Sequence, residues 1–297
     1  MNDIGRRASL GEALDAAAGE LERAGLRDPR REATALWGAL QGLGPGEVWR
    51  RRDTPAAPEQ SQRFWDAVQR RSSGVPFAYV VGRVPFRTLD LGIDPRALIP
   101  RPETEGLVEL VLDWLATRET RDERRETGGV AADIGTGSGC IALSLAVEAN
   151  LERVIAVDAA VDAAALTREN IALVRPSTPV EVRVGDLLAP LAGERCQVIV
   201  SNPPYLTEAE YTALDPSVRQ FEPRMALASG ADGLAATRVL LDGARAVLEP
   251  DGLLALEIDE RRGEVVRRLA RDAGWTNVAI HQDLFGRPRY ALVTDRD

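Results

Sequence analysis

The chain has 297 residues, of which 44% are hydrophobic and 28% charged, a composition that can bury the core of one large or two modest domains. Its formal net charge is −9, which argues against generic binding to the phosphate backbone of nucleic acids. Its two cysteines, Cys140 and Cys196, cannot build a disulfide framework or a zinc pattern, so we interpret them as small core residues and expect no metal site.

The first 74 residues are predicted to form a small helical domain. Ser9 and Glu12 fit a capping box at the start of a helix in which apolar residues recur at helical spacing. Two more helices are expected, one over Arg31–Leu40 and one after Pro58. We expect this domain to recognise a protein substrate.

Charge is distributed unevenly along the chain. Residues 1–80 carry 12 Arg and 11 acidic residues, whereas residues 81–297 carry 25 Arg and 35 acidic residues. The N-terminal part is therefore the better candidate for meeting an RNA or a basic protein. Met1–Arg7 has no apolar signal-peptide core and no apolar run approaches transmembrane length, so we expect a cytoplasmic location.

Residues 75–100 are expected to form a β-hairpin that links two domains. Two sets of apolar residues predict short extended segments, with turns at Gly82 and Pro85: Phe77, Tyr79 and Val81, and then Phe86, Leu89, Leu91 and Ile93.

Residues 101–297 are predicted to form one domain in which strands and helices alternate. Strands are expected at Val130–Asp133, Arg153–Val157, Val180–Val184, Gln197–Ser201, Leu253–Ile258, Asn277–Gln282 and Tyr290–Thr294. Helices are expected at Gly106–Ala116, Cys140–Ala149, Asp162–Val174, Gly233–Val247 and Glu264–Ala273. Alternation of this kind predicts an α/β fold with a mostly parallel sheet covered by helices on both faces. The last two strands are expected to form a hairpin at the sheet edge.

A glycine-rich loop, Asp133-Ile134-Gly135-Thr136-Gly137-Ser138-Gly139, follows the first of these strands and opens a helix. Its glycines allow close approach of the backbone to a ligand, and the helix start supplies free N–H groups; such a loop could serve NAD, FAD or S-adenosylmethionine. The next two strands end in Asp158 and Asp186, which suit ribose hydroxyls and an adenine amino group. The alternative is that both acids only cap strand ends.

Asn202-Pro203-Pro204-Tyr205 follows the fourth strand. An Asn carboxamide can accept a hydrogen bond from an N–H₂ group while its own NH₂ is held elsewhere, and Tyr offers a flat face for stacking. The prolines present carbonyls without a competing N–H donor. The alternative is a Pro-rich turn that only leaves a strand. Because ligands gather at the C-terminal strand ends of such sheets, we expect the loop and the tetrapeptide to face one crevice from adjacent strands.

On these residues the chain resembles class I S-adenosylmethionine-dependent methyltransferases with an Asn-Pro-Pro-Tyr motif, and within them the protein-(glutamine-N5) methyltransferases of peptide chain release factors. The resemblance spans almost the whole chain and rests on Pro76–Tyr79, Gly82, Leu98–Glu105, Asp133–Gly139, Asn202–Tyr205, Phe221–Pro223, Ala226 and Leu227. The tetrapeptide is shared with adenine-N6 DNA methyltransferases, whereas Leu98–Glu105 is more particular to the glutamine group. The chain departs from the family at Asp259 and Arg261, where Gly and Gln are usual, which puts the local turn in doubt.

The resemblance implies a Rossmann-like methyltransferase sheet and methyl transfer to the side-chain amide nitrogen of the glutamine in the Gly-Gly-Gln motif of class I release factors. It implies S-adenosylmethionine as the cofactor, bound by Gly135, Thr136, Gly137, Ser138, Gly139, Asp158, Asp186, Leu187 and Asn202. The Asn202 side-chain oxygen and the Pro203 carbonyl would accept the two N–H bonds of the substrate amide, with Pro204 beside them and Tyr205 on the amide plane. We expect a monomer whose partner is a release factor, with no membrane and no nucleic-acid substrate.

Two questions stay open at this point. Arg101 and Glu103 fit either the rim of the cofactor crevice or a surface Arg beside a helix cap. The acceptor could instead be a glutamine of a ribosomal protein or an exocyclic amine of a nucleic acid, such as adenine N6; the latter usually needs a basic channel and a pocket for a flipped base, which the acidic residues 81–297 do not favour. A cofactor-binding module without catalysis would have no use for the tetrapeptide.

Overall fold

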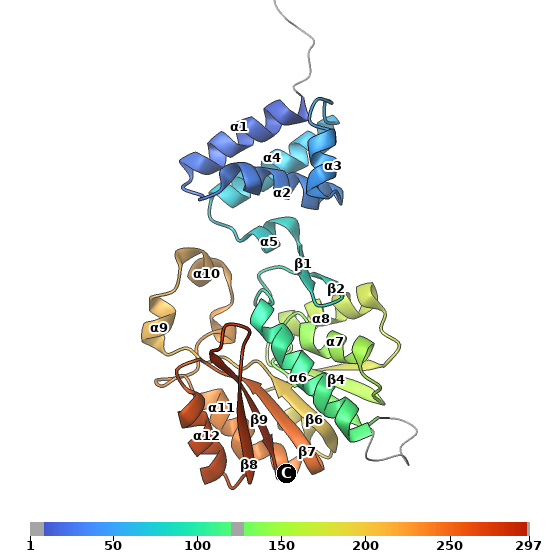
Figure 1. Ribbon diagram of the computed structural model, residues 1–297, viewed down its shortest axis with the longest axis vertical. Coiled ribbons are helices and arrows are strands. Elements are labelled where there is room, and N and C mark those ends of the chain that lie inside the picture. Colours follow the sequence, from blue (N-terminus) through green and yellow to red (C-terminus); the bar gives the residue numbers. More distant parts are fainter. Residues whose placement is uncertain (1–8, 120–127, 296–297) are drawn as a thin grey trace, which may run out of the picture. The chain divides into compact units, whose positions relative to one another are not determined.

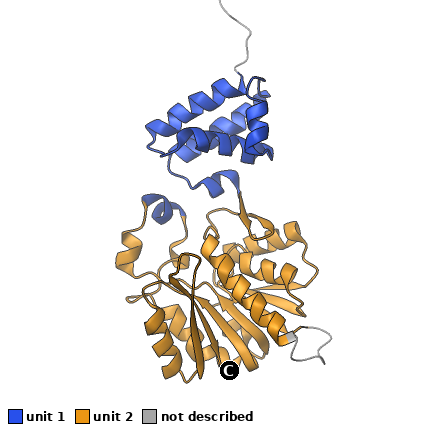
Figure 2. Cartoon of the chain, viewed as in Figure 1, with its two compact units in different colours: residues 1–82, 216–221 blue, residues 83–215, 222–297 orange. Residues whose placement is uncertain are grey.

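The computed structural model describes residues 9–119 and 128–295, and the chain forms two compact units (Figure 2). The first comprises residues 1–82 and 216–221, and the second comprises residues 83–215 and 222–297. Met1–Arg7 and residues 120–127, which follow α6, lie outside the described residues. The division of the chain after residues 74 and 100 stays a prediction. Within the described ranges, no helix is both long and apolar enough to cross a membrane.

The first unit consists of helices. They are α1 (Leu10–Arg23), α2 (Pro29–Gln41), α3 (Pro45–Arg50), α4 (Pro58–Ser72), α5 (Phe77–Val81) and α10 (Pro216–Phe221). All of them except α10 contribute to one apolar core. Trp37 and Phe64 meet edge to face at 5.2 Å between ring centroids, inside a cluster that includes the fully buried Leu21 and Leu36. The capping box at Ser9 is confirmed, while α3 and α10 were not predicted.

The extended segment expected over Phe77–Val81 is wrong, because these residues form α5. An apolar run of five residues is too short to distinguish the period of a strand from that of a helix. Its members Phe77, Val80 and Val81 have helical spacing and pack on the core of the first unit. The helix ends at Gly82, whose φ of +77° is the left-handed conformation that favours glycine at this position.

The second unit begins with a two-stranded hairpin and contains a seven-stranded sheet. The hairpin pairs β1 (Arg83–Phe86) with β2 (Leu89–Gly92); Pro85, expected at a turn, lies in β1 opposite Asp90. The sheet strands are β3 (Val130–Ile134), β4 (Arg153–Asp158), β5 (Val180–Val184), β6 (Cys196–Ser201), β7 (Leu248–Glu257), β8 (Asn277–Gln282) and β9 (Pro288–Thr294). Their order is β5-β4-β3-β6-β7-β9-β8, parallel from β5 to β7, with the antiparallel hairpin β8–β9 at one edge as predicted.

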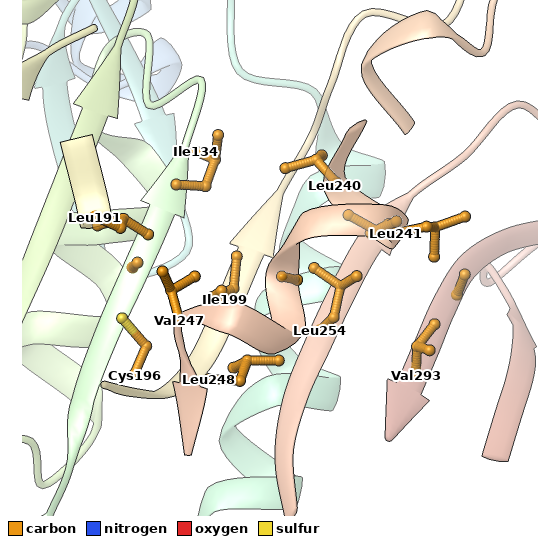
Figure 3. Packing of buried hydrophobic residues seen from close by; sticks show 14 of the residues in the cluster. Ile134, Leu191, Cys196, Ile199, Leu240, Leu241, Val247, Leu248, Leu254 and Val293 are labelled. Carbon is orange, nitrogen blue, oxygen red and sulfur yellow. The ribbon is translucent and has the colours of Figure 1, made fainter. Parts of the chain in front are cut away.

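Helices cover both faces of the sheet (Figure 1). They are α6 (Pro102–Glu119), α7 (Cys140–Glu148), α8 (Val161–Val174), α11 (Ala235–Gly243) and α12 (Gly263–Asp272). Figure 3 shows the core on the α11 side, where Leu240 and Leu241 meet Ile199 and Leu254 of neighbouring strands. Cys196 is buried in this cluster, and Cys140 is buried at the start of α7, so both are core residues as interpreted from the sequence.

Element bounds differ modestly from the predictions. The helix expected over Gly233–Val247 is α11 followed by a 3₁₀ turn, Ala244–Ala246, and the helix expected from Gly106 begins four residues earlier at Pro102. The short helix α9 (Glu208–Thr212) was not predicted.

Gly106 provides a stability test of how α6 packs on β9. A Cβ at this helical position would lie 2.9 Å from Tyr290 Cζ and closer still to its hydroxyl, which donates to the Glu103 carbonyl at 2.6 Å. Replacing a helical Gly by Ala usually stabilises by about 1 kcal/mol. We expect Gly106→Ala to lower the free energy of unfolding by about 1–3 kcal/mol instead. Gly19→Ala in α1, where a Cβ meets nothing within 4 Å, is the matched control and should be neutral or stabilising in urea unfolding.

Candidate active site

A cavity of about 470 Å³ lies within the second unit. Its volume is in the range of roughly 300–1,000 Å³ that is usual for small-molecule sites. Nine of the residues predicted from the sequence line it: Gly135, Thr136, Gly137, Ser138, Asp158, Asp186, Leu187, Asn202 and Pro204. Gly139, Pro203 and Tyr205 do not belong to the lining, although each is adjacent in sequence to a residue that does.

The glycine loop and the tetrapeptide come from adjacent strands, as predicted. β3 and β6 are parallel neighbours, with Ile134 opposite Ser201. The buried Ser201 hydroxyl donates to the Ile134 carbonyl at 2.7 Å and ties the two strand ends together. Because both segments leave the sheet at its C-terminal edge, they face the same cavity.

The backbone of the glycine loop is held in a conformation that requires glycine. Gly135, Gly137 and Gly139 have φ values of +75°, +58° and +82°. Helix α8 supports the loop from behind, since the Thr167 hydroxyl donates to the Gly137 carbonyl at 2.9 Å and Asn170 Nδ2 donates to the Ser138 carbonyl at 2.8 Å. A ligand in the cavity therefore meets a rigid backbone.

Asp158 both caps a strand end and faces the cavity. Its two carboxylate oxygens accept from the N–H groups of Gly137 at 2.9 Å and Ala160 at 2.8 Å. A carboxylate has about four acceptor positions, so capacity remains for ribose hydroxyls. Asp186, the second residue after β5, is exposed and also lines the cavity. The two readings of Asp158 are thus compatible.

The lining suits S-adenosylmethionine in shape and charge. Apolar side chains, among them Ile141, Val157 and Leu187, offer a surface for a purine ring, and the two aspartates complement a ligand that carries a sulfonium charge. No Cβ narrows the cavity at Gly135 or Gly137. The residues present therefore fit this cofactor.

Asp133, the last but one residue of β3, holds the glycine loop through hydrogen bonds. It is fully buried, accepts from the Thr136 hydroxyl at 2.6 Å and from the Ala142 N–H at 3.1 Å, and so joins the loop to the first turn of α7. Burial raises the pKa of its carboxyl to about 7.

Asn202 is oriented by a buried network that the sequence did not reveal. Its Nδ2 donates to Thr104 Oγ1 at 3.1 Å, and the Thr104 hydroxyl donates to Glu257 Oε2 at 2.7 Å. Thr104 and Glu257 are each 2% exposed. Thr104 lies in α6 and Glu257 ends β7, so only the tertiary fold brings them to Asn202. This network holds the carboxamide NH₂, as the motif requires, and leaves Oδ1 as the acceptor.

Tyr205 is half-buried beside this network. Burial raises the pKa of its phenol to about 12, and the Glu257 charge acts in the same direction. The ring therefore stays neutral in the physiological range, which suits a stacking surface and not a base.

Arg101 lies at the rim of the cavity, whereas Glu103 does not. Arg101 lines the cavity and donates to Glu222 Oε1 at 2.7 Å. Glu222 is buried, and its other oxygen accepts from the Ile99 N–H at 3.2 Å. Glu103 sits in the first turn of α6, and its carbonyl accepts from Tyr290. Glu222 thus anchors the Leu98–Glu105 segment against the cavity.

The Glu222 anchor predicts a measurable loss of stability when it is removed. Glu222→Ala removes a buried acceptor and leaves the Ile99 N–H and Arg101 without their partner, so we expect unfolding free energy to fall by about 1–3 kcal/mol. Glu208→Ala, which breaks an exposed ion pair with Arg224, should change it by less than about 0.5 kcal/mol. Denaturant unfolding of the two variants measures the difference. Equal effects would contradict the anchor.

The turn at Asp259 is held together by Asp259 and Arg261, the two residues that differ from the usual Gly and Gln of the family. Asp259 Oδ1 accepts from the Arg261 N–H and Nε, each at 2.9 Å, and the Asp259 carbonyl accepts from the Arg262 N–H. An Asp–Arg pair therefore builds the turn that precedes α12.

Two family matches cover most of the chain. Residues 12–82 match the PrmC N-terminal domain, and residues 112–219 match the methyltransferase small domain. Among solved structures, the catalytic domain of human METTL16 in complex with an RNA hairpin aligns over 81% of this chain and 83% of its own, with a TM-score of 0.54 and 17% identity. The N-terminal domain of the same human protein in complex with SAH gives a TM-score of 0.51 at 18% identity, over 81% of this chain and 84% of its own. These likenesses show the fold, a Rossmann-like methyltransferase sheet, as predicted.

Curated relatives are similar over nearly the whole chain. The release factor glutamine methyltransferase of Moorella thermoacetica is 40% identical over 290 residues, which cover 97% of this chain and 99% of the relative. That of Deinococcus radiodurans is 38% identical, covering 95% and 96%. Matches of this length span both the helical N-terminal unit and the methyltransferase part of the chain. The chain therefore belongs to the family of release factor glutamine methyltransferases.

Proposed function

We propose that this protein transfers a methyl group from S-adenosylmethionine to the side-chain amide nitrogen of the glutamine in the Gly-Gly-Gln motif of class I release factors. The observation that carries the proposal is the hydrogen bond from Asn202 Nδ2 to Thr104, which leaves the carboxamide oxygen to accept from a substrate N–H₂ group. Membership of the family supports the acceptor class.

Each residue of the site has a defined task in this proposal. Gly135–Gly139, Asp158, Asp186 and Leu187 bind the cofactor, which supplies an activated methyl group on a sulfonium. Asn202 Oδ1 and the Pro203 carbonyl accept the two N–H bonds of the glutamine amide, Pro204 lies beside them, and Tyr205 packs on the amide plane. These contacts aim the nitrogen lone pair at the methyl carbon.

Positioning is the main source of rate in this mechanism. The amide nitrogen is a poor nucleophile because its lone pair is delocalised, and holding two reactants in line can supply roughly 7–11 kcal/mol of a barrier. The bound cofactor would supply the methyl group and leave as a neutral thioether, with its C–S bond exchanged for the new N–C bond, and one amide proton would leave to water. The neutral Tyr205 and the acceptor oxygens of the site need not take that proton.

We further propose that the helical N-terminal part recognises the release factor. It is the less acidic part of the chain, and it matches a domain family of its own. The reaction as proposed takes place in the cytoplasm, with the protein as a monomer.

The acceptor class is tested by supplying several acceptors in parallel. The protein is incubated with methyl-labelled S-adenosylmethionine and, separately, a class I release factor, ribosomal proteins or duplex DNA. Label in the release factor supports the proposal. Label in DNA or in ribosomal proteins with none in the release factor overturns it.

A further inference from the structure

The orientation of the Asn202 carboxamide is determined by the hydrogen-bonding groups around it. A carboxamide has a donor end and an acceptor end of nearly equal size, and a flip by half a turn exchanges them. With the oxygen toward the substrate, Asn202 accepts an amide N–H. With the NH₂ toward it, two donors face each other and the site cannot bind a glutamine amide.

We propose that Glu257, acting through Thr104, is the positioning residue that locks Asn202 with its oxygen toward the substrate. This inference rests on the proposed function. An ionised carboxylate can only accept hydrogen bonds, so the single hydroxyl proton of Thr104 goes to Glu257. The Thr104 oxygen is then available only as an acceptor, and it takes Asn202 Nδ2. The direction of every bond follows from the charge of Glu257.

The fold places the three groups for this task. Ser201 lies opposite Leu256 in the parallel pair β6–β7. The next residue on each side is Asn202, directly after β6, and Glu257, the last residue of β7, so these two lie side by side. Thr104 reaches them from the first turn of α6. All three belong to the second unit, and the bond between Thr104 and Glu257 is buried, so water cannot easily replace it.

Protonation of Glu257 would release the lock. A neutral carboxyl can donate to Thr104, which then can donate to Asn202 Oδ1 and turn the NH₂ toward the substrate. Burial raises the pKa of Glu257 to about 7, with Thr104 and Arg289 opposing the rise. The other groups that interact with it are Arg101 and Glu103 near the start of α6, Cys140 at the start of α7, Tyr205 after β6, and Tyr290 on β9. The lock therefore strengthens as pH rises through the neutral range.

Kinetics of the full-length protein with an intact release factor test the lock. We expect Thr104→Val to lower kcat at least tenfold with the KM for S-adenosylmethionine within about twofold of wild type, because the glycine loop and Asp158 are untouched. Thr104→Ser keeps the hydroxyl and should restore kcat to within about threefold. A kcat for Thr104→Val equal to wild type, or a Thr104→Ser variant as impaired as Thr104→Val, would overturn the inference.

The pH dependence separates the lock from a merely structural role. Wild-type kcat should rise with a midpoint near pH 7, and Glu257→Gln should be slower and lack that rise. Thr104→Val added to Glu257→Gln should cost little more, because both act through one chain of bonds. Additive losses, or an unchanged pH profile in Glu257→Gln, would count against the inference.

Unfolding gives a readout that does not depend on activity. The pKa of Glu257 is raised in the folded protein, so its contribution to stability is fully present below the ordinary carboxyl pKa and is lost as pH rises toward 7. Glu257→Gln should therefore show a smaller decline in unfolding free energy over this range than wild type. An identical decline overturns the assignment of the buried charge. If the wild-type protein does not methylate release factors, the proposed function is wrong. The unfolding measurement needs no substrate, so it still tests the Glu257 assignment separately.

Discussion

Asn202→Ala is expected to reduce methyl transfer by about a hundred- to a thousandfold, the usual cost of removing one well-placed hydrogen-bonding group from a reacting centre. The substitution removes the oxygen that accepts the substrate N–H and leaves Thr104 without its donor. Asn202 also lines the cavity, but cofactor affinity should fall far less than turnover, since the glycine loop and Asp158 are untouched. Single-turnover kinetics and calorimetric titration of S-adenosylmethionine measure the two quantities.

Asn277→Ala is the matched control for this prediction. Asn277 is half-buried at the start of the edge strand β8 and plays no part in the proposed site. Its removal should leave turnover unchanged. If Asn202→Ala retains turnover within a few-fold of wild type, the carboxamide does not hold the substrate.

Gly139→Ala is expected to weaken cofactor binding at least tenfold and to destabilise the protein. Gly139 has a φ of +82°, and a Cβ there would lie 2.9 Å from Thr167 Cγ2. Thr167 is the residue that supports the Gly137 carbonyl, so the clash moves the backbone that faces the cofactor. Left-handed backbone costs a non-glycine residue about 1–2 kcal/mol in addition.

Gly193→Ala is the control that introduces backbone strain without the clash that Gly139→Ala makes with Thr167. Gly193 has nearly the same φ, +85°, but a Cβ there meets nothing within 4 Å, and the residue does not line the cavity. It should lose about 1–2 kcal/mol of stability without any change in cofactor affinity. Titration of S-adenosylmethionine into both variants decides the point. Equal affinities would show that the Gly139 conformation does not shape the cofactor site.

The parts of the site that local sequence encodes could be predicted. One strand is followed by a glycine-rich loop and another by Asn202–Tyr205. Both patterns predict a place at the C-terminal edge of a parallel sheet. The adjacency of β3 and β6 then follows from the topology of such sheets. The family resemblance supplied the acceptor, which no spacing of residues could give.

The parts that depend on long-range contacts could not be predicted. Thr104 and Glu257 are 153 residues apart, and a Thr at a helix start or a Glu at a strand end is usual in any α/β protein. Arg101 could not be assigned because its partner, Glu222, lies 121 residues away. The helix α5 was mistaken for an extended segment because five residues carry too little periodicity, and its packing on the helical core decided the outcome.

The proposed methyl acceptor is one atom, the amide nitrogen of a glutamine. The most direct test is tandem mass spectrometry of the peptide that contains the Gly-Gly-Gln motif, taken from a release factor treated with the protein and S-adenosylmethionine. The account predicts a mass increase of one methylene unit that fragmentation assigns to the glutamine side chain, and none with Asn202→Ala. A methyl group on any other residue, or an unmodified motif beside labelled ribosomal protein or DNA, would contradict it.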